Sequence, residues 1–284
     1  MSGGQGPEPT QNRRGAFAPR VMLAGVDFDM VDFDGALDII VRLASDGRRH
    51  HVVTANVDHV MLLRRNERFR RAYEFASLRV ADGAPIVLLS KLVGRPLPVR
   101  VTGSDLFELV CERAQSEGLS VGFLGGRPDA VPIALDKLRL QFPELRIAGA
   151  HCPPYGFDTD AAQTAEAVAA VDEMQPDLLF VLLGAPKQET WFQDHAQSMP
   201  PLAALHFGAS LDFYAGIVQR APSVWRRFGL EWLYRLVKEP RRMWRRYLVR
   251  DVGFFRILVF ETLRARVYPR RPPEMRRPAT DPST

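Results

Sequence analysis

The side chains best suited to chemistry lie in four short polar clusters, each of which follows an apolar segment. They are Thr54-Ala55-Asn56, Ala81-Asp82-Gly83, Arg100-Val101-Thr102-Gly103-Ser104-Asp105 and Gly184-Ala185-Pro186-Lys187-Gln188-Glu189. Ligands of open α/β sheets bind in the crevice beyond the carboxyl ends of the strands. Because each cluster falls where a predicted strand gives way to a loop or helix, we expect all four to line one such crevice.

Asp82 is the candidate general base. It follows a short predicted strand and precedes Gly83, which leaves room for a ligand to approach closely. A partly desolvated carboxylate in that position can take a proton from an attacking hydroxyl group. The structural alternative is that Asp82 caps a helix that starts near Pro85, because Asp is favoured at helix N-termini.

The other polar clusters supply candidate substrate-binding groups. Thr54 and Asn56 face the same way if the segment is extended, although they could instead satisfy loop backbone groups. Arg100 and a helix that begins within Thr102, Gly103 and Asp105 could hold a diphosphate, because a guanidinium and free helix N–H groups both bind anions. Further candidates in two glycine-containing turns are Gly125, Gly126, Gly184, Lys187 and Gln188.

No metal is expected. The pairs Asp27/Asp29 and Asp32/Asp34 have the spacing of a metal-binding DxD motif, but such short matches are weak, and flanking a turn or capping a helix explains them better. No His or Cys group has the spacing of a metal site.

Strand and helix signals alternate over residues 21–219 and predict an α/β fold, a Rossmann-like, largely parallel sheet sandwiched by helices. Strands are expected at 21–28, 51–55, 78–80, 120–124, 146–150, 177–183 and 202–207. Helices are expected at 34–45, 58–75 (as one helix or two), 85–92, 104–116, 128–141 and 186–195, with Ser104 or Asp105 as a cap. Residues 1–20 and 269–284 are rich in Pro, Gly and Arg and read as disordered tails.

Charge divides the chain in two. From Arg220 to the end there are 17 Lys and Arg against 6 Asp and Glu, whereas the preceding residues carry 21 against 27. No segment is apolar for the roughly 20 residues that a membrane-spanning helix needs, and no signal-peptide pattern opens the sequence. Two isolated cysteines indicate a reducing cytoplasm and no disulfide.

Residues 220–268 are expected to form a helical, basic appendage that associates with a membrane. Helices are predicted at 225–238 and 241–267, with Trp and Phe side chains suited to an interface. Its anionic partner would be a lipid surface contacted by Arg227, Arg235, Arg241, Arg245 and Arg246. The alternative is a solvated basic face whose apolar side packs on the core.

Seven motifs in order resemble the WecG/TagA/CpsF glycosyltransferase family. They are Thr-x-Asn, an Asp-Gly pair 28 residues after that Thr, Arg-Val-Thr-Gly-x-Asp, Phe-Leu-Gly-Gly, Gly-Ala-Pro-Lys-Gln-Glu, Arg-Ala-Pro and Gly-Leu-Glu-Trp-Leu-Tyr-Arg-Leu, within residues 21–250. Each motif alone is weak, but their order makes coincidence improbable.

The resemblance implies a metal-independent, inverting enzyme without a cofactor. It would move a sugar from a UDP-sugar to a polyprenyl-diphosphate-linked acceptor, as a peripheral protein on the cytoplasmic face of the bacterial membrane. The family's proposed base matches Asp82, its pocket residues match Thr54, Asn56, Arg100 and Gln188, and its C-terminal appendage helps to complete the site. Arg100, Lys187 or an arginine from residues 220–227, with Arg220 as our candidate, could then meet the charge of the leaving diphosphate.

Two other classes stay open at this point. A nucleotide-binding oxidoreductase would need a GxGxxG fingerprint, which the Gly122–Gly126 segment lacks. A nucleic-acid-binding protein could use the basic end of the chain, but the acidic body would then be unexplained, so no nucleic acid is expected. A homo-oligomer is compatible with the sequence, and the motifs do not specify the sugar.

Overall fold

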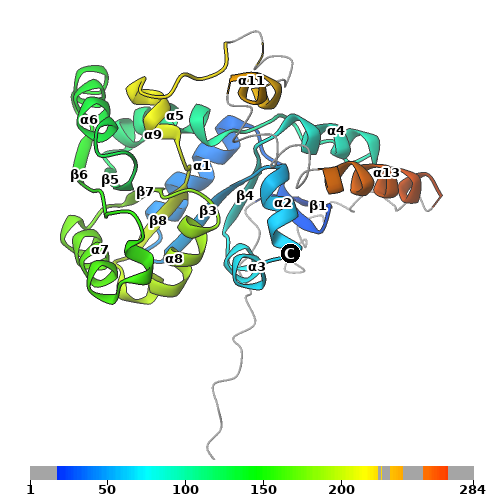
Figure 1. The fold of residues 1–284 in the computed structure, drawn as a ribbon. Helices are drawn as coiled ribbons and strands as arrows, with labels where there is room; N and C mark the ends of the chain where they lie inside the picture. The colour runs from blue at the N-terminus through cyan, green and yellow to red at the C-terminus, as the bar shows by residue number, and fades with distance from the viewer. Residues whose placement is uncertain (1–17, 223–224, 226–230, 239–251, 268–284) are drawn as a thin grey trace, which may run out of the picture.

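The computed structural model describes residues 18–222, 225, 231–238 and 252–267 of the 284-residue chain. Its centre is a six-stranded sheet in the order β4-β3-β8-β7-β5-β6, in which every neighbouring pair is parallel (Figure 1). The strands are β3 Arg49–Ala55, β4 Leu78–Ala81, β5 Ser120–Gly125, β6 Arg146–His151, β7 Leu178–Leu182 and β8 Leu202–His206. The predicted parallel α/β sheet is therefore confirmed for this part of the chain.

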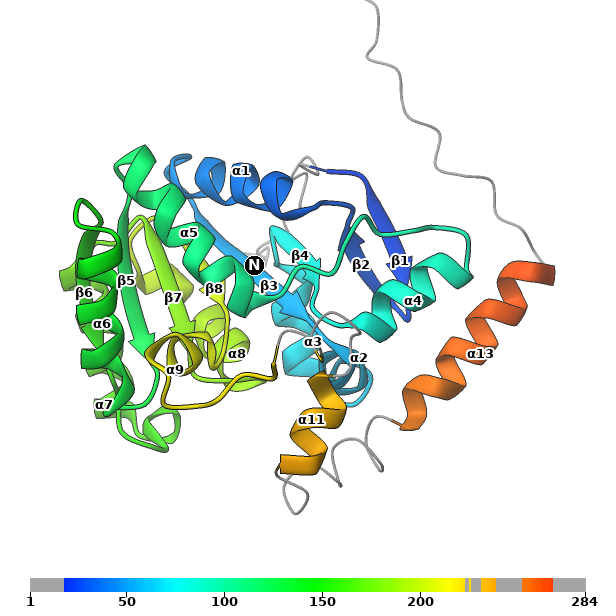
Figure 2. The same cartoon turned by 90° about the horizontal axis from the view of Figure 1, so that it is seen from above.

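Helices cover both faces of the sheet, and Figure 2 shows α1 and α5 on one side with α3 and α8 on the other. The first face carries α1 Phe33–Ala44, α5 Gly103–Glu117, α6 Ala130–Gln141 and α9 Ser210–Ala215. The second carries α2 Val57–Leu63, α3 Glu67–Glu74, α7 Ala161–Met174 and α8 Lys187–His195, with α4 Ala84–Leu92 beyond β4. Two 3-10 turns, η1 Phe157–Thr159 and η2 Ala196–Ser198, follow β6 and α8.

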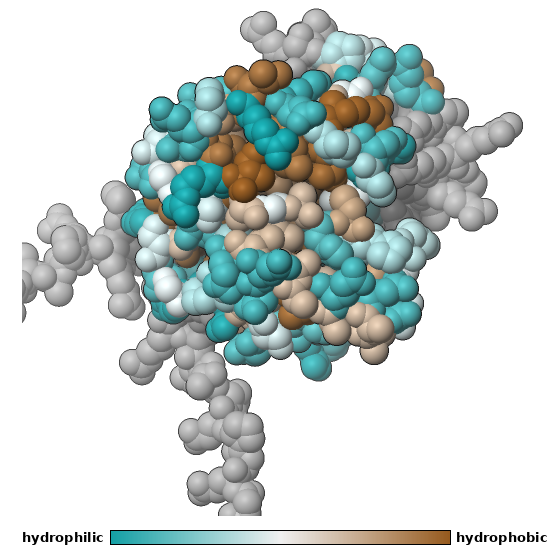
Figure 3. Space-filling model, turned by 90° about the vertical axis from the view of Figure 1, so that its left-hand side faces the viewer, coloured by the Kyte–Doolittle hydropathy of each residue, from teal (hydrophilic) through white to brown (hydrophobic). Residues whose placement is uncertain are grey.

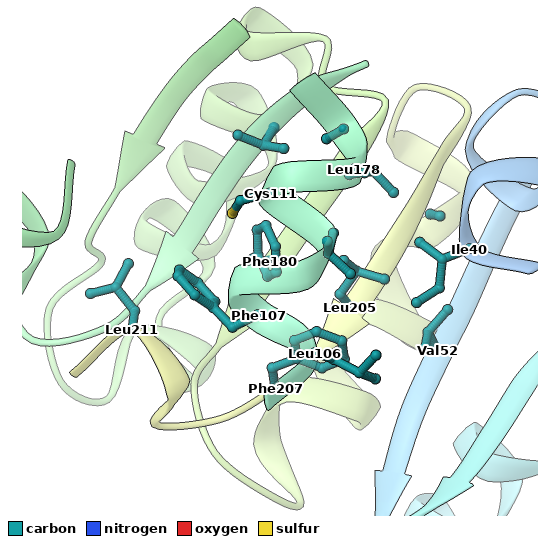
Figure 4. Packing of buried hydrophobic residues seen from close by; sticks show 14 of the residues in the cluster. Ile40, Val52, Leu106, Phe107, Cys111, Leu178, Phe180, Leu205, Phe207 and Leu211 are labelled. Carbon is teal, nitrogen blue, oxygen red and sulfur yellow. The ribbon is translucent and has the colours of Figure 1, made fainter. Parts of the chain in front are cut away.

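Alternate strand residues divide the core between these two helical layers, as the period of two along a strand requires. Phe180 and Leu205 point into the cluster beneath α5, whereas Val181 and Ala204 belong to the cluster beneath α7 and α8. Figure 4 shows Phe107 of α5 lying against Phe180, with ring centroids 4.8 Å apart. This packing fixes α5 over the middle of the sheet.

The first predicted strand is wrong in one respect. Residues 21–28 do not form a single strand but an antiparallel hairpin of β1 Arg20–Leu23 and β2 Val26–Asp29. Ala24 and Gly25 between them both have positive φ, +54° and +84°. Two consecutive positive φ values are the mark of a tight hairpin turn, and Ala at the first position concealed it in the sequence.

Two helices of the C-terminal segment are described, α11 Glu231–Lys238 and α13 Val252–Val267. Within the described residues, none of the helices combines the length and apolar character that crossing a bilayer requires. α13 packs against α2 and α4, and Phe254 is buried there at 2 % exposure. Phe254, one of the Phe side chains within the predicted helix 241–267, therefore packs on the body of the protein and not at an interface.

Gly125 gives a test of how tightly the end of β5 is packed. Its φ is +93°, and an added Cβ would lie 2.7 Å from Leu183 Cδ2 and 2.9 Å from the Leu182 carbonyl oxygen. Gly125→Ala should lower the free energy of unfolding by roughly 3 kcal/mol, from backbone strain plus overpacking. Urea denaturation measures this loss.

Gly47→Ala is the matched control for that measurement. Gly47 also has a positive φ, +72°, but a Cβ added to it would have no atom within 4 Å. Only the conformational penalty of about 1 kcal/mol should remain. Equal losses in the two variants would contradict the packing at Gly125.

Candidate active site

The predicted reactive clusters meet at the carboxyl edge of the sheet. The Asp82 amide donates to the Ala55 carbonyl at 2.8 Å, and the Val101 amide donates to the Ala81 carbonyl at 3.0 Å. These bonds hold the residue that follows β4, and the segment that carries Arg100, beside the ends of β3 and β4. The structure thus brings the first three clusters together.

Asp82 is not the cap of α4. Gly83 occupies that position, and no side-chain hydrogen bond caps the helix. The Asp82 side chain is half-buried, and its charge contributes to the raised pKa of Tyr73 in α3. The structural alternative weighed from the sequence is therefore removed, and the carboxylate lies near a buried phenol.

Thr54 and Asn56 differ in their surroundings. Thr54 is buried, and its hydroxyl makes a long contact of 3.5 Å to the His206 carbonyl at the end of β8. Asn56 caps α2, because its Oδ1 accepts from the His59 amide at 3.1 Å. Asn56 Oδ1 is therefore committed to the backbone, and its Nδ2 carries the donors that could serve a ligand.

The start of α5 is tied to the beginning of the C-terminal segment. Thr102, rather than Ser104 or Asp105, is the N-cap, since its Oγ1 accepts from the Asp105 amide at 3.1 Å. Asp105 pairs with Arg220 at 2.7 Å, and the Arg220 guanidinium also lies 3.4 Å from Thr102 Oγ1. Three candidate residues therefore form one connected group.

Charges around Asp105 keep it ionised. Burial alone would raise the pKa of Asp105, but hydrogen bonds from Arg220 and Thr102, with the charges of Arg220 and Arg100, lower it overall. Arg100 consequently lies within electrostatic reach of the same carboxylate. The edge beside Asp82 holds two guanidinium groups and the acid that orients one of them.

Glycines allow the strand ends to approach one another. A Cβ on Gly103 would come within 3.3 Å of Phe207, directly after β8. Gly126 has a φ of +83°, and its amide donates to the Leu182 carbonyl at 3.0 Å. The predicted sites Gly103, Gly125 and Gly126 thus have a packing role at the carboxyl edge.

The fourth cluster forms a braced turn after β7. Gly184 has a φ of +75°, its amide donates to Gln188 Oε1 at 3.2 Å, and its carbonyl accepts from the Gln188 amide at 3.0 Å. Gln188 is buried and donates from Nε2 to Glu189 Oε1 at 2.9 Å. Its second Nε2 hydrogen is one donor more than these contacts use.

Lys187 pairs with a carboxylate of η1, which the sequence did not predict. Its ammonium pairs with Asp158 of η1 at 2.6 Å and lies over the rings of Tyr155 and Phe157. The sequence placed Lys187 at the mouth of the crevice, with no indication of this partner 29 residues away. A contact of Lys187 with substrate stays a prediction.

Sequence reasoning missed a buried polar group behind the edge. The Tyr73 hydroxyl lies 2.6 Å from His59 Nδ1, and burial, followed by the charges of Glu189 and Asp82, raises the pKa of Tyr73. His206 is also fully buried, so its pKa is lowered and the ring is neutral. One sequence signal could have placed Glu189 in this buried group. Glu189 and Phe192 are three residues apart in a predicted helix, and this spacing predicts that both side chains face the core.

Of the remaining predicted residues, Asp32 caps α1 through a bond from the Gly35 amide, as expected. In the part of the chain that the structure describes, no three His, Cys, Asp or Glu side chains group to hold a metal. Arg227, Arg241, Arg245 and Arg246 lie outside the described residues, and only the backbone of Arg235 is described, in α11.

Comparison with known proteins decides the class. The model of the "Glycosyl transferase WecG/TagA/CpsF family" matches residues 21–268. The chain belongs to this family. It is also 35% identical, over 197 residues, to the N-acetylglucosaminyldiphosphoundecaprenol N-acetyl-beta-D-mannosaminyltransferase of Bacillus spizizenii. The aligned residues make up 69% of this chain and 74% of that protein.

Membership of the WecG/TagA/CpsF family confirms the resemblance drawn from the seven motifs and makes the chain a glycosyltransferase. The oxidoreductase and nucleic-acid-binding alternatives are thereby set aside. The carboxyl edge, where Asp82, Arg100 and Arg220 gather, is the candidate active site of this transferase.

The Arg220–Asp105 pair offers a test of the connection between the site and the C-terminal segment. Because the pair is partly buried, a double-mutant cycle with Arg220→Gln and Asp105→Asn should give a coupling of about 1–3 kcal/mol at pH 7. The pKa of Asp105 is lowered on folding, so this stability is present above the unfolded value and is lost as pH falls through the folded value. Urea denaturation at several pH values measures both effects.

The exposed pair Arg139–Asp136 of α6 serves as the control for that cycle. Its side chains are 61% and 74% exposed, and such surface pairs couple by less than about 1 kcal/mol. A coupling no larger for Arg220–Asp105 than for this pair would show that the contact does not anchor the segment.

Proposed function

We propose that the protein is an inverting, metal-independent hexosyltransferase that uses a UDP-sugar donor and an undecaprenyl-diphosphate-linked sugar acceptor. The transferred sugar is N-acetylmannosamine or another hexose, and the setting is bacterial cell-surface polysaccharide biosynthesis. The name of the Bacillus spizizenii relative supports the acceptor and the sugar. The observation that carries the proposal is the position of Asp82 at the carboxyl edge, beside the group of Thr102, Asp105 and Arg220.

The reaction would be a single displacement. Asp82 takes the proton from the acceptor hydroxyl, whose oxygen attacks the anomeric carbon of the donor from the face opposite the diphosphate. The bond from that carbon to the diphosphate oxygen breaks, and UDP leaves with the electron pair. Inversion follows because one displacement occurs.

The negative charge that develops on the diphosphate must be met by cations and N–H groups of the protein. Arg100 and Arg220 are the candidates, and Asp105 orients Arg220 through the 2.7 Å pair. Thr54, Asn56, Gln188 and the turn at Gly184 would contact the sugars from the β3 and β7 sides of the edge. This division of roles explains why polar residues from four separate segments converge there.

Asp82→Asn tests the assigned base. The amide cannot accept the proton, so kcat should fall by about 10²- to 10⁴-fold while UDP binding stays within a fewfold of the wild type. Two measurements test this prediction. Turnover is measured in EDTA with a panel of UDP-sugars and short-chain polyprenyl-diphosphate acceptors, and UDP binding is measured by calorimetric titration.

Asp172→Asn, an exposed substitution on α7, is the control for the base assignment and should leave kcat unchanged. Near-normal turnover of the Asp82→Asn variant would remove Asp82 as the base. Loss of all turnover of the wild-type enzyme in EDTA would contradict the metal-independent reaction.

We also propose that α13 rests on the cytoplasmic face of the membrane. While Phe254 packs on the body, the opposite arc of α13 exposes Phe255, Val259, Phe260 and Leu263 next to Arg256 and Arg264. Figures 1 and 2 both show α13 beside α4, which exposes Leu88 and Leu92. Apolar side chains with basic neighbours suit an anionic lipid surface, where each basic residue contributes about 1 kcal/mol.

The double substitution Phe255→Ser and Phe260→Ser should reduce co-flotation with anionic vesicles about tenfold or more, because both rings are over 60% exposed and would lose their lipid contact. The control is Leu140→Ser on α6, where an 84% exposed side chain lies on the other side of the molecule. Figure 3 looks onto that side and shows apolar side chains gathered in its upper half. If the control reduced flotation as strongly, the lipid-facing side would be misassigned.

A further inference from the structure

Glu189 is a buried acid to which the proposed reaction gives no part. Glu189 is 0% exposed. Its Oε1 accepts a hydrogen bond from Gln188 Nε2 at 2.9 Å, and its Oε2 is buried without a hydrogen-bond partner among the described residues. An ionised carboxylate without a cation beside it is costly to bury. Burial accordingly raises the pKa of Glu189 to about 7, although the bond from Gln188 lowers it.

Glu189 lies where it can control the turn after β7. It follows Gln188 in the first turn of α8, and Gln188 is bonded through both its side-chain oxygen and its backbone amide to Gly184. The Thr190 hydroxyl closes the same turn by donating to the Pro186 carbonyl at 2.9 Å. A chain of contacts thus runs from the Glu189 carboxyl through the Gln188 amide to the Gly184 backbone.

The surroundings of α8 explain why the charge of Glu189 matters. α3 packs against α8, and both Glu189 and Asp82 act electrostatically on the Tyr73 hydroxyl of α3. The two acids are therefore close enough to influence the same group. Among the described residues, the other titratable or charged groups on or near α8 include His59 of α2, His51 of β3, His206 of β8, His195 of α8, the pair Arg68–Asp194 and the pair Lys187–Asp158.

Among the residues that the structure describes, no cation pairs with the Glu189 carboxyl. Lys187 and Arg68 are each paired with their own carboxylates, and His206 is neutral because burial, and then the charges of His51 and His59, lower its pKa. Ionisation of Glu189 would consequently add a buried negative charge near Asp82, with the Gln188 amide and the Glu189 backbone N–H, but no cation, to stabilise it. It would also act against the binding of a diphosphate at the same edge.

We propose that Glu189 is a positioning residue that works only as a neutral acid, holding the Gln188 amide and the Gly184 turn in the arrangement that binds substrate. This inference rests on the proposed function and assigns Glu189 no proton transfer to or from substrate. A protonated carboxyl can accept from Gln188 through Oε1 while its O–H group adds no charge. Gln at this position would reproduce the shape and the acceptor without the ability to ionise.

The test compares the pH dependence of kcat and KM in the wild type, Glu189→Gln and Glu189→Ala between pH 6 and 9. In the wild type, kcat/KM should fall about 25-fold from pH 6.5 to 8.5, following the neutral fraction of an acid with a pKa of about 7. Glu189→Gln should stay within about threefold of the wild type at pH 6.5 and lose this alkaline fall. Glu189→Ala should lose about 10- to 100-fold in kcat/KM at every pH, because the Gln188 amide is no longer held.

Glu166→Gln, an exposed substitution on α7, is the matched control and should retain the wild-type pH profile. An alkaline fall that persists unchanged in Glu189→Gln would overturn the inference, as would a folded Glu189→Ala enzyme with wild-type kcat/KM. If Glu189→Ala does not fold, the Gln variant alone decides. Wild-type enzyme without turnover on any UDP-sugar would instead refute the proposed function.

Infrared spectroscopy provides a readout that does not depend on turnover. The wild type should show a protonated-carboxyl band at pH 6 that disappears by pH 9, and Glu189→Gln should lack that band. The same band in Glu189→Gln, or its absence from the wild type at pH 6, would show that Glu189 is not the neutral acid.

Discussion

The common direction of six strands is the constraint on which the site depends. Because every pair in the sheet is parallel, all carboxyl ends lie at one edge, and each connection must return across a helical layer before the next strand begins. The sheet itself thereby places residues that are far apart in the chain side by side. The bonds from the Asp82 amide to Ala55 and from the Val101 amide to Ala81 extend this order one residue beyond the strands. Asp82, the candidate base, is the first residue after β4.

Behind that edge, the packing of α2, α3 and α8 encloses polar groups in an apolar layer. His59, Tyr73 and Glu189 come from one helix each, and the hydroxyl of Tyr73 joins them electrostatically to Asp82. Such a group is stable only when few of its members are charged, since the interior offers little to solvate an ion. The Phe69 ring lies against both His59 and Tyr73, and the Phe192 ring lies against His206. The candidate site thus lies in front of buried polar groups for which an apolar surrounding disfavours charge.

The sequence was informative where the signal is local. Buried strands read as apolar runs, polar residues marked their ends, and the position of Asp82 followed from both. It was uninformative where a partner is distant: Asp105 and Arg220 are 115 residues apart, and nothing in either segment specifies the other. The Lys187–Asp158 pair is a similar case, because Asp158 belongs to a turn without a periodic pattern. The hairpin at Ala24 was missed because alternation continues through it, and Thr102 was passed over as a cap because Ser104 and Asp105 are equally good capping residues.

Contact between α13 and α2 joins the C-terminal segment to the candidate active site through packed helices. Gly253 lies so close to Met61 that a Cβ would approach the Met61 methyl group within 2.6 Å, and α2 is capped by Asn56, one of the candidate ligands of the sugar. If α13 lies on lipid, the height of the reactive edge above the headgroups is set by helix packing and not by the length of a tether. An acceptor sugar carried on a lipid diphosphate would then be presented at a fixed depth. The reach of the enzyme along a growing glycan would be limited to the sugars nearest the bilayer.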